Sequence, residues 1–373
     1  MHKFRNLMTS AVGLTCLFLT QVVASQILIG QTAGFTGPVG AGVKETTEGA
    51  KIYFDNVNAK GGINGQKIEL ISLDDKFDPK LAAENAQQLV EVKNVVAMFL
   101  TRGTPHTQAV IPILEKNRVP LVGPSTGAMA LHTPLQKYIF NVRSSYQREA
   151  EKAMLHLHTI GMTRIGIVHV DDSFGADAAV GAQKGLAITK LQAVGIEKFD
   201  RTNPNFKPIA DKLYRASAQA VLVVGTGPAV VDALTAIRAT GSSAQIITLS
   251  NNASGGFIKS LNGKGTGVIV TQVFPNEKSI SYPLVNEAQI LAKAKSVSAV
   301  TPAMMEGFTA AKVLVEGLRR AGRKPNRDKL QAALEGLKNF DVGGLKISYS
   351  VNSHSGLDFV DLSIIGADGQ FKR

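Results

Sequence analysis

The sequence contains no tryptophan, a single cysteine and few aromatic residues, which make up 6% of the chain. Cys16 lies near the N-terminus, so the rest of the chain forms no disulfide and offers no thiolate for catalysis or metal binding. Few aromatic side chains also leave little surface on which nucleic-acid bases can stack. We therefore expect packing alone to stabilise the main part of the chain, and we expect no binding to nucleic acid.

Long apolar runs are absent except near the N-terminus. Residues 11–19 are largely apolar, Lys3 and Arg5 precede them, and Ala24 with Ser25 offers a small-residue cleavage site. This pattern is typical of a secretory signal peptide, because the run is shorter than the ~20 apolar residues that span a bilayer. The residues before Cys16 do not form a lipidation box. We predict export to the periplasm and cleavage after residue 25.

Acidic residues are in deficit, with 29 against 41 lysines and arginines, for a net charge of +12. Loss of the signal peptide removes two cations and no anions. The remaining basic residues are dispersed along predicted helices, and clusters such as residues 319–324 are short. This distribution favours a solvated basic surface or an anionic ligand over nucleic acid.

Residues 37–79 contain the pattern of one complete α/β unit with its connecting loops. Helical spacing of apolar residues predicts a helix over residues 43–58, which Gly61 and Gly62 end because glycine enters left-handed conformations easily. A strand over residues 67–73 follows. Asp78 then suits a helix N-cap and Pro79 the first helical position.

Strands and helices alternate along most of the remaining chain. This order predicts parallel strands with right-handed helical crossovers, and hence an α/β protein with two doubly wound sheets. Breaks in the pattern fall near residues 142–146, 273–276 and 351–356.

Three sequence motifs suggest other functions. Residues 123–127 match the G-x-S-x-G nucleophile elbow, so a secreted serine hydrolase using Ser125 stays an alternative, although none of the candidate histidines has an obvious partner. His156 and His158 are two residues apart on a predicted helix and point to different faces, which disfavours a metal site. Val230 replaces the third glycine of a dinucleotide loop that begins at Gly225. We therefore predict no metal and no cofactor.

Hydroxyl-bearing residues and glycines gather at the predicted carboxyl ends of strands, where open α/β sheets bind ligands. Backbone N–H groups at the following helix starts favour a carboxylate there. The candidate ligand-binding residues of these loops are Thr104, Ser125, Thr126, Gly127, Phe174, Thr226 and Ser250.

The N-terminal unit resembles the periplasmic leucine/isoleucine/valine-binding protein family, the type I solute receptors of ABC importers. The resemblance rests on Gly37-Pro38, on residues 58–65 (NAKGGING) and on the run from Asp74 to Pro79. It implies a type I periplasmic-binding-protein fold with a three-strand hinge, no enzymatic activity, and ABC permease subunits as partners. By this resemblance lobe 1 takes residues 26–143 and 274–352, and lobe 2 takes residues 144–273 and 353–373.

The resemblance also assigns roles to single residues. Thr104 matches a ligand-binding hydroxyl position, Ser125 and Gly127 match contacts to a ligand carboxylate, and Phe174 matches an aromatic lid. Arg102 and Tyr146 border the cleft in this interpretation and add an anion clamp or a stacking surface.

Two departures from the family pattern concern the ligand. Ser250 stands where branched-chain amino-acid receptors carry a glutamate for the ligand ammonium, and Gly42 stands where a tyrosine covers the ligand. Either the ligand lacks an α-amino group, or one of three other carboxylates replaces that glutamate: Asp171, Asp172 or Glu306. The expected ligand is a small carboxylate, either a branched-chain type of amino acid or an aromatic or aliphatic acid. A ligand sensor for a membrane receptor is a further alternative.

Overall fold

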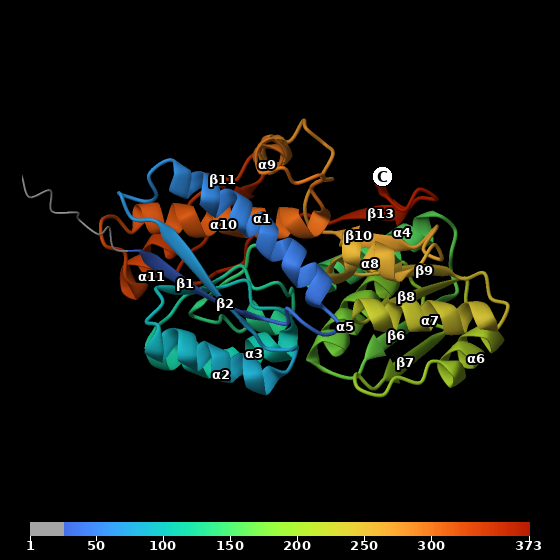
Figure 1. Cartoon of the computed structure of the whole chain (residues 1–373). Coiled ribbons are helices and arrows are strands. Elements are labelled where there is room, and N and C mark those ends of the chain that lie inside the picture. The colour runs from blue at the N-terminus through green and yellow to red at the C-terminus, as the bar shows by residue number, and fades with distance from the viewer. Residues whose placement is uncertain (1–25) are drawn as a thin grey trace, which may run out of the picture.

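The computed structural model describes residues 26–373, and the predicted signal peptide lies outside them. Two lobes lie side by side, each built around its own main β-sheet (Figure 1). Separate clusters of buried apolar side chains form the two main cores. The predicted fold class, two doubly wound α/β lobes, is confirmed.

Lobe 1 contains a five-stranded parallel sheet in the order β2-β1-β3-β4-β5. Its strands are β1 (Ile27–Ala33), β2 (Ile68–Asp74), β3 (Ala97–Phe99), β4 (Leu121–Val122) and β5 (Ile139–Phe140), with a small hairpin of β11 (Phe340–Asp341) and β12 (Lys346–Ile347). Its helices are α1 (Gly40–Ala59), α2 (Pro79–Gln87), α3 (Thr104–Asn117), α9 (Pro283–Ala294), α10 (Pro302–Arg320) and α11 (Arg327–Glu335), with short turns η1 (Gln88–Val92) and η2 (Met129–Leu131).

Lobe 2 contains a seven-stranded sheet in the order β14-β13-β10-β9-β8-β6-β7. Its strands are β6 (Ile165–Val170), β7 (Gly195–Phe199), β8 (Ala220–Val224), β9 (Gln245–Thr248), β10 (Ile269–Gln272), β13 (Asp361–Ile365) and β14 (Phe371–Lys372). Its helices are α4 (Tyr146–Thr159), α5 (Ser173–Ile188), α6 (Lys207–Arg215), α7 (Gly227–Ala239) and α8 (Gly255–Ser260), with the turn η3 (Ser250–Asn252). Strands β13 and β14 are antiparallel to their neighbours, and the other pairs are parallel.

The chain passes between the lobes three times: after β5, after β10 and before β13. Two of these connections are hydrogen-bonded to each other, since the Leu357 N–H donates to the Val142 carbonyl at 2.9 Å and the Asn141 N–H to the His354 carbonyl at 2.9 Å. The residue-by-residue lobe boundaries given above stay a prediction.

Helix α1 follows the sequence pattern closely. The residues that helical spacing places on its inner face are all buried: Val43, Thr47, Ala50, Tyr53, Phe54 and Val57. The helix ends before Gly61 and Gly62, whose φ angles are +95° and +75°. It begins three residues earlier than predicted, at Gly40. Asp78 caps α2 by accepting the Lys80 N–H at 2.7 Å, and Pro79 is the first helical residue, as predicted.

Glycines allow α1 to lie directly against α10. A Cβ atom at Gly49 would lie 2.0 Å from the Met304 carbonyl oxygen, and one at Gly307 would lie 1.7 Å from the Thr46 carbonyl oxygen. Only glycine fits at such distances. The close contact fixes α10 against the middle of α1.

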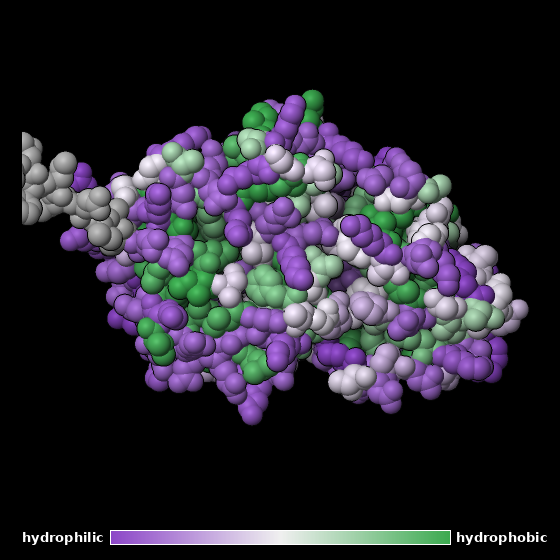
Figure 2. Space-filling view, in the orientation of Figure 1, coloured by the Kyte–Doolittle hydropathy of each residue, from purple (hydrophilic) through white to green (hydrophobic). Residues whose placement is uncertain are grey.

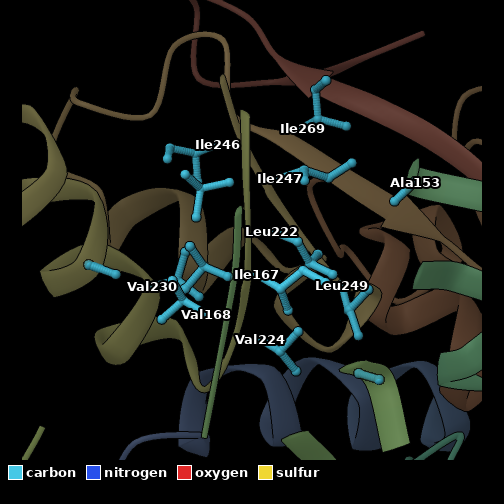
Figure 3. Packing of buried hydrophobic residues seen from close by; sticks show 14 of the residues in the cluster. Ala153, Ile167, Val168, Leu222, Val224, Val230, Ile246, Ile247, Leu249 and Ile269 are labelled. Carbon is cyan, nitrogen blue, oxygen red and sulfur yellow. The ribbon is translucent and has the colours of Figure 1, made fainter. Parts of the chain in front are cut away.

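The core of lobe 2 is made of aliphatic side chains from neighbouring strands. Ile167, Leu222 and Ile247 meet between β6, β8 and β9, and Val230 of α7 covers one face (Figure 3). Such continuously apolar strands are typical of parallel sheets that helices cover on both faces. This rigid support holds the loops at the strand ends in place.

Hydrophilic residues cover much of the face shown in Figure 2, with hydrophobic residues in separate patches between them. Across residues 26–373, none of the helices has both the length and the hydropathy needed to cross a membrane.

Candidate functional site

The candidate site lies where loops at the strand ends of both lobes meet. Arg102 is in the loop between β3 and α3, and its side chain is 7% exposed. Its guanidinium donates from Nη1 to Ser125 Oγ at 2.9 Å and from Nη2 to the Asn251 carbonyl oxygen at 2.7 Å. Ser125 belongs to lobe 1 and Asn251 to lobe 2, so this arginine bridges the two lobes.

Arg102 lacks a counter-charge. Both of its hydrogen-bond acceptors are neutral, and among residues 26–373 no carboxylate lies within ion-pair distance of it. An arginine stays protonated at any ordinary pH, and a buried charge is costly unless it is paired. The arrangement is therefore suited to an anion brought by a ligand.

Hydroxyl groups of two lobe 1 loops meet beside this arginine. Thr104 and Thr126 share a hydrogen bond of 2.7 Å between their hydroxyl oxygens, and both are buried. The Ser125 N–H donates to the Thr101 carbonyl at 2.7 Å, which fixes the direction of the Ser125 side chain. The structure thus brings together three of the predicted hydroxyl-bearing residues.

Gly127 connects this loop to the first crossing between the lobes. Its carbonyl accepts the Tyr146 N–H at 2.7 Å, and a Cβ atom there would lie only 2.6 Å from the Ser144 carbonyl oxygen. Gly127 therefore has a packing reason to be glycine, whether or not it also contacts a ligand.

Two predicted aromatic residues pack on each other. The rings of Tyr146 and Phe174 have centroids 4.7 Å apart at an interplanar angle of 54°, and both side chains are buried. Burial raises the pKa of Tyr146, and the cationic side chains of Arg143 and Arg102 lower it in part. Phe174 thus covers Tyr146 at the lobe 2 side of the cleft.

The last two predicted residues lie on the lobe 2 side. Thr226 occupies the N-cap position of α7 but makes no capping hydrogen bond with its side chain. Ser250 Oγ accepts a hydrogen bond from Arg143 Nη2 at 2.6 Å, and its N–H donates to Glu149 Oε2 at 2.9 Å. Ser250 therefore belongs to a charged network that the sequence analysis did not predict.

That network is centred on Arg143, in the first crossing. Its Nη2 forms an ion pair with Glu149 of α4, and its Nη1 lies 3.6 Å from Glu306 Oε1 of α10. Burial alone would lower the pKa of Arg143, but the two carboxylates outweigh this effect and raise it. Arg143 lies in a segment that the sequence marked only as a break in the helix–strand pattern. Ser250 and Glu306 were named as candidates for the ligand site, and no sequence signal linked them to Arg143.

The hydrolase alternative finds no geometric support. Ser125 Oγ is hydrogen-bonded to an arginine, and no histidine of the described chain is among its hydrogen-bond partners. Within residues 26–373, no group of three histidine, aspartate or glutamate side chains is placed to hold a metal ion.

A cavity of about 160 Å³ adjoins Arg102 between the lobes. Its walls come from the start of α1 in lobe 1 and from the starts of α7, η3 and α8 in lobe 2. Sequence analysis missed most of this wall, because its residues are glycines, prolines and small polar residues without a motif.

Two lobes that enclose a polar cleft define a solute-binding protein. The family model for periplasmic binding proteins matches residues 26–358, and the chain belongs to this family. The members are substrate-binding proteins and not enzymes.

Individual relatives agree with this assignment. A substrate-binding periplasmic protein from Ralstonia solanacearum is 32% identical, with a TM-score of 0.85 over 93% of this chain and 99% of that one. A possible leucine/isoleucine/valine-binding protein from Rhodopirellula baltica is 25% identical, with a TM-score of 0.88 over 95% and 98%. The Leu/Ile/Val-binding protein homolog 3 of Brucella melitensis is 25% identical over 92% of each chain. The resemblance seen in the sequence is confirmed.

Proposed function

We propose that this protein is exported to the periplasm, loses its signal peptide, binds a small carboxylate between its lobes and delivers it to an ABC permease. The observation that carries the proposal is the buried, unpaired guanidinium of Arg102 at the junction of the lobes. Export and the permease follow from the N-terminal sequence pattern and from the family.

A carboxylate suits Arg102 for geometric reasons. The guanidinium is a planar fork of donors, and it binds carboxylates through two parallel hydrogen bonds. Its present acceptors, a serine hydroxyl and a backbone carbonyl, are weaker partners that a ligand can replace. Ser125, Thr104 and Thr126 do not line the cavity beside Arg102, and the Ser125 hydroxyl group orients the guanidinium.

Binding and closure are coupled because the site takes residues from both lobes. Arg102 and Ser125 come from lobe 1, whereas Asn251 comes from lobe 2. A ligand held by both sides stabilises the closed arrangement by as much as it prefers that arrangement over the open one. The permease then recognises the closed form.

The test replaces Arg102 with glutamine and titrates a panel of carboxylates by calorimetry after a thermal-shift screen. We expect affinity for the best carboxylate to fall roughly 10- to 100-fold, the value of a charge-assisted hydrogen bond. Arg118→Gln is the control, since Arg118 is a lobe 1 arginine that pairs with Asp328 on the surface. Unchanged affinity in Arg102→Gln would show that the carboxylate site lies elsewhere.

A further inference from the structure

The cavity beside Arg102 has an unusual charge balance. Among its fourteen lining residues, Arg102 is the only charged one. The polar remainder is neutral and consists of Asn251, Asn252, Ser254 and Ser260. A Cβ atom added to Gly42 would lie 3.8 Å from Ser254 Oγ and 4.0 Å from Arg102 Nη2, so the guanidinium faces this space.

None of the three carboxylates named as alternatives is free to meet a ligand ammonium there. Asp171 pairs with Lys198 at 2.9 Å on the surface of lobe 2. Asp172 pairs with Arg201 and caps α5, and Glu306 lies beside Arg143. None of the three lines the cavity.

Glu45 is another carboxylate close to this cavity, and its hydrogen bonds are already made. Its oxygens accept the N–H groups of Gly255 and Gly256 at 3.0 and 2.8 Å, and the Thr301 hydroxyl at 2.8 Å. It lines a different hollow, between α1 and the segment before α10. A ligand ammonium in the Arg102 cavity would therefore meet a cation and no available anion.

One neutral acceptor in the cavity wall lacks a donor. Asn251 donates from Nδ2 to the Gly225 carbonyl at 2.9 Å, while its Oδ1 is inaccessible to solvent and accepts no hydrogen bond from residues 26–373. A buried acceptor without a donor is costly, but an oxygen that solvent does not reach is not open to a ligand either. The polar groups left for a ligand are the neutral side chains of Asn252, Ser254 and Ser260.

The volume of the cavity is about 160 Å³, and the cavity is partly open to solvent. It therefore accommodates a compact organic acid, and a larger ligand would extend beyond it.

Resting on the function proposed above, we propose that the ligand is a compact monocarboxylate without an ammonium group, with a 2-hydroxy acid as the best-matched class. Its carboxylate pairs with Arg102, and its hydroxyl meets the neutral polar side chains of the wall, such as Asn252, Ser254 and Ser260. Burying an ammonium beside this guanidinium, with no carboxylate to receive it, is unfavourable. The cavity thus selects against amino acids by charge.

The first test compares matched pairs that differ in the 2-substituent: L-lactate with L-alanine, 2-hydroxy-4-methylpentanoate with L-leucine, and L-mandelate with L-phenylglycine. Affinities for the purified protein are measured by calorimetry at pH 7.5. We expect the hydroxy acid to bind at least tenfold more tightly in the pair of best-fitting size. An amino acid that binds as tightly as its hydroxy partner overturns the inference.

The same data separate this inference from the proposed function. If an amino acid wins and Arg102→Gln still loses affinity, the carboxylate receptor stands and only the ligand class is wrong. If no member of any pair binds, the inference is overturned. If a carboxylate binds and Arg102→Gln has no effect on it, both are wrong.

A pair of variants tests whether charge causes the preference for hydroxy acids over amino acids. Ser254 caps α8 by accepting the Phe257 N–H at 3.1 Å, and both aspartate and asparagine cap helices equally well. Ser254→Asp places a carboxylate in the cavity wall, so the ratio of hydroxy-acid to amino-acid affinity should fall at least tenfold. Ser254→Asn adds the same bulk without charge and should keep that ratio. An equal ratio in the two variants contradicts the inference.

Discussion

Two buried arginines at the junction of the lobes differ in one respect. Arg143 is 1% exposed and Arg102 is 7% exposed, and each makes a hydrogen bond to lobe 2. Arg143 has two carboxylates beside it, whereas Arg102 has only a hydroxyl and a carbonyl. The first guanidinium is paired with carboxylates of the protein itself, and the second has only neutral hydrogen-bond partners, as the proposed ligand site requires.

This difference distinguishes a structural charge from a binding charge. A charged group that stabilises the fold is paired within the protein, so removing it leaves its partners buried without a counter-charge. A group that waits for a ligand costs stability in the free protein, and removing it harms only binding. The comparison therefore predicts opposite results for the two arginines, and the following experiments test it.

The largest effect is expected for Arg143→Met. The substitution leaves Glu149 and Glu306 buried without a cation, and breaking a buried ion pair costs about 3–5 kcal/mol of unfolding free energy. Urea unfolding followed by circular dichroism measures it, because the chain has no tryptophan to follow by fluorescence. Arg148→Ala, which removes a half-exposed arginine, should cost less than about 1 kcal/mol.

A double variant sharpens the same test. Adding Glu149→Gln to Arg143→Met removes one of the stranded carboxylates, so part of the lost stability should return. If the double variant is less stable than Arg143→Met by the full cost of a second independent substitution, the network does not act as a unit.

Asp75 is a buried carboxyl group whose charge depends on pH. It is fully buried, and burial raises its pKa to about 6, against which hydrogen bonds from the Phe77 N–H and the Thr32 hydroxyl act in part. Its folded pKa lies above the unfolded value of 3.8, so its contribution to stability is complete below that value and is lost as pH rises through about 6.

Asp75→Asn should therefore make the protein more stable at pH 7.5, by up to roughly 3 kcal/mol, and leave it nearly unchanged at pH 4. Asp74→Asn is the matched control with the opposite sign. Burial raises the pKa of Asp74, but hydrogen bonds from Thr36 and Lys76 outweigh it and lower the pKa overall. Its contribution is thus present at neutral pH and is lost as pH falls. If the change in unfolding free energy depends on pH in the same way for the two variants, the raised pKa of Asp75 and the lowered pKa of Asp74 are both contradicted.

The sequence predicted the fold better than the site. Helical spacing and glycine breaks located α1, and alternation of helices with strands predicted both sheets. Helix α9 was missed although Leu284, Val285 and Ala288 have helical spacing, because Tyr282 gives no capping signal before Pro283. Strand β13 is antiparallel to β10, and this direction depends on a crossing between the lobes that local patterns do not encode.

For the site, sequence located loops and not partners. Position after a strand was enough to select Thr104 and Ser125, whereas Arg102 was named through the family resemblance, and the structure brings these loops together. The contact between Arg102 and Asn251 joins residues 149 positions apart, and nothing local predicts it. Charge pairing decides which arginine is free, and pairing is a property of the folded chain alone.

Glu45→Ala should have a medium effect, because Glu45 is a lobe-bridging charge whose hydrogen bonds are complete without a ligand. It accepts two N–H groups at the start of α8 in lobe 2, and losing them removes about 1–2 kcal/mol from the closed arrangement. Affinity should fall roughly 5- to 30-fold for every ligand alike, which calorimetry with two unlike ligands measures. Glu48→Ala changes an exposed position one turn further along α1 and should leave the affinity for both ligands unchanged. A loss confined to one ligand would assign Glu45 to the binding site.

The smallest effect is expected for Gly42→Ala, which should move stability and binding in opposite directions. Gly42 lies within α1, and an added Cβ atom would have no neighbour closer than 3.8 Å, so alanine fits and should stabilise the helix by roughly 0.5–1 kcal/mol. The same methyl group projects toward Arg102 Nη2 at 4.0 Å and narrows the cavity where we place the ligand. Urea unfolding and calorimetry on this one variant should show a higher midpoint and a several-fold weaker affinity. Stabilisation with unchanged affinity would place the ligand away from this cavity. The missing counter-charge of Arg102 would then not be explained by ligand binding.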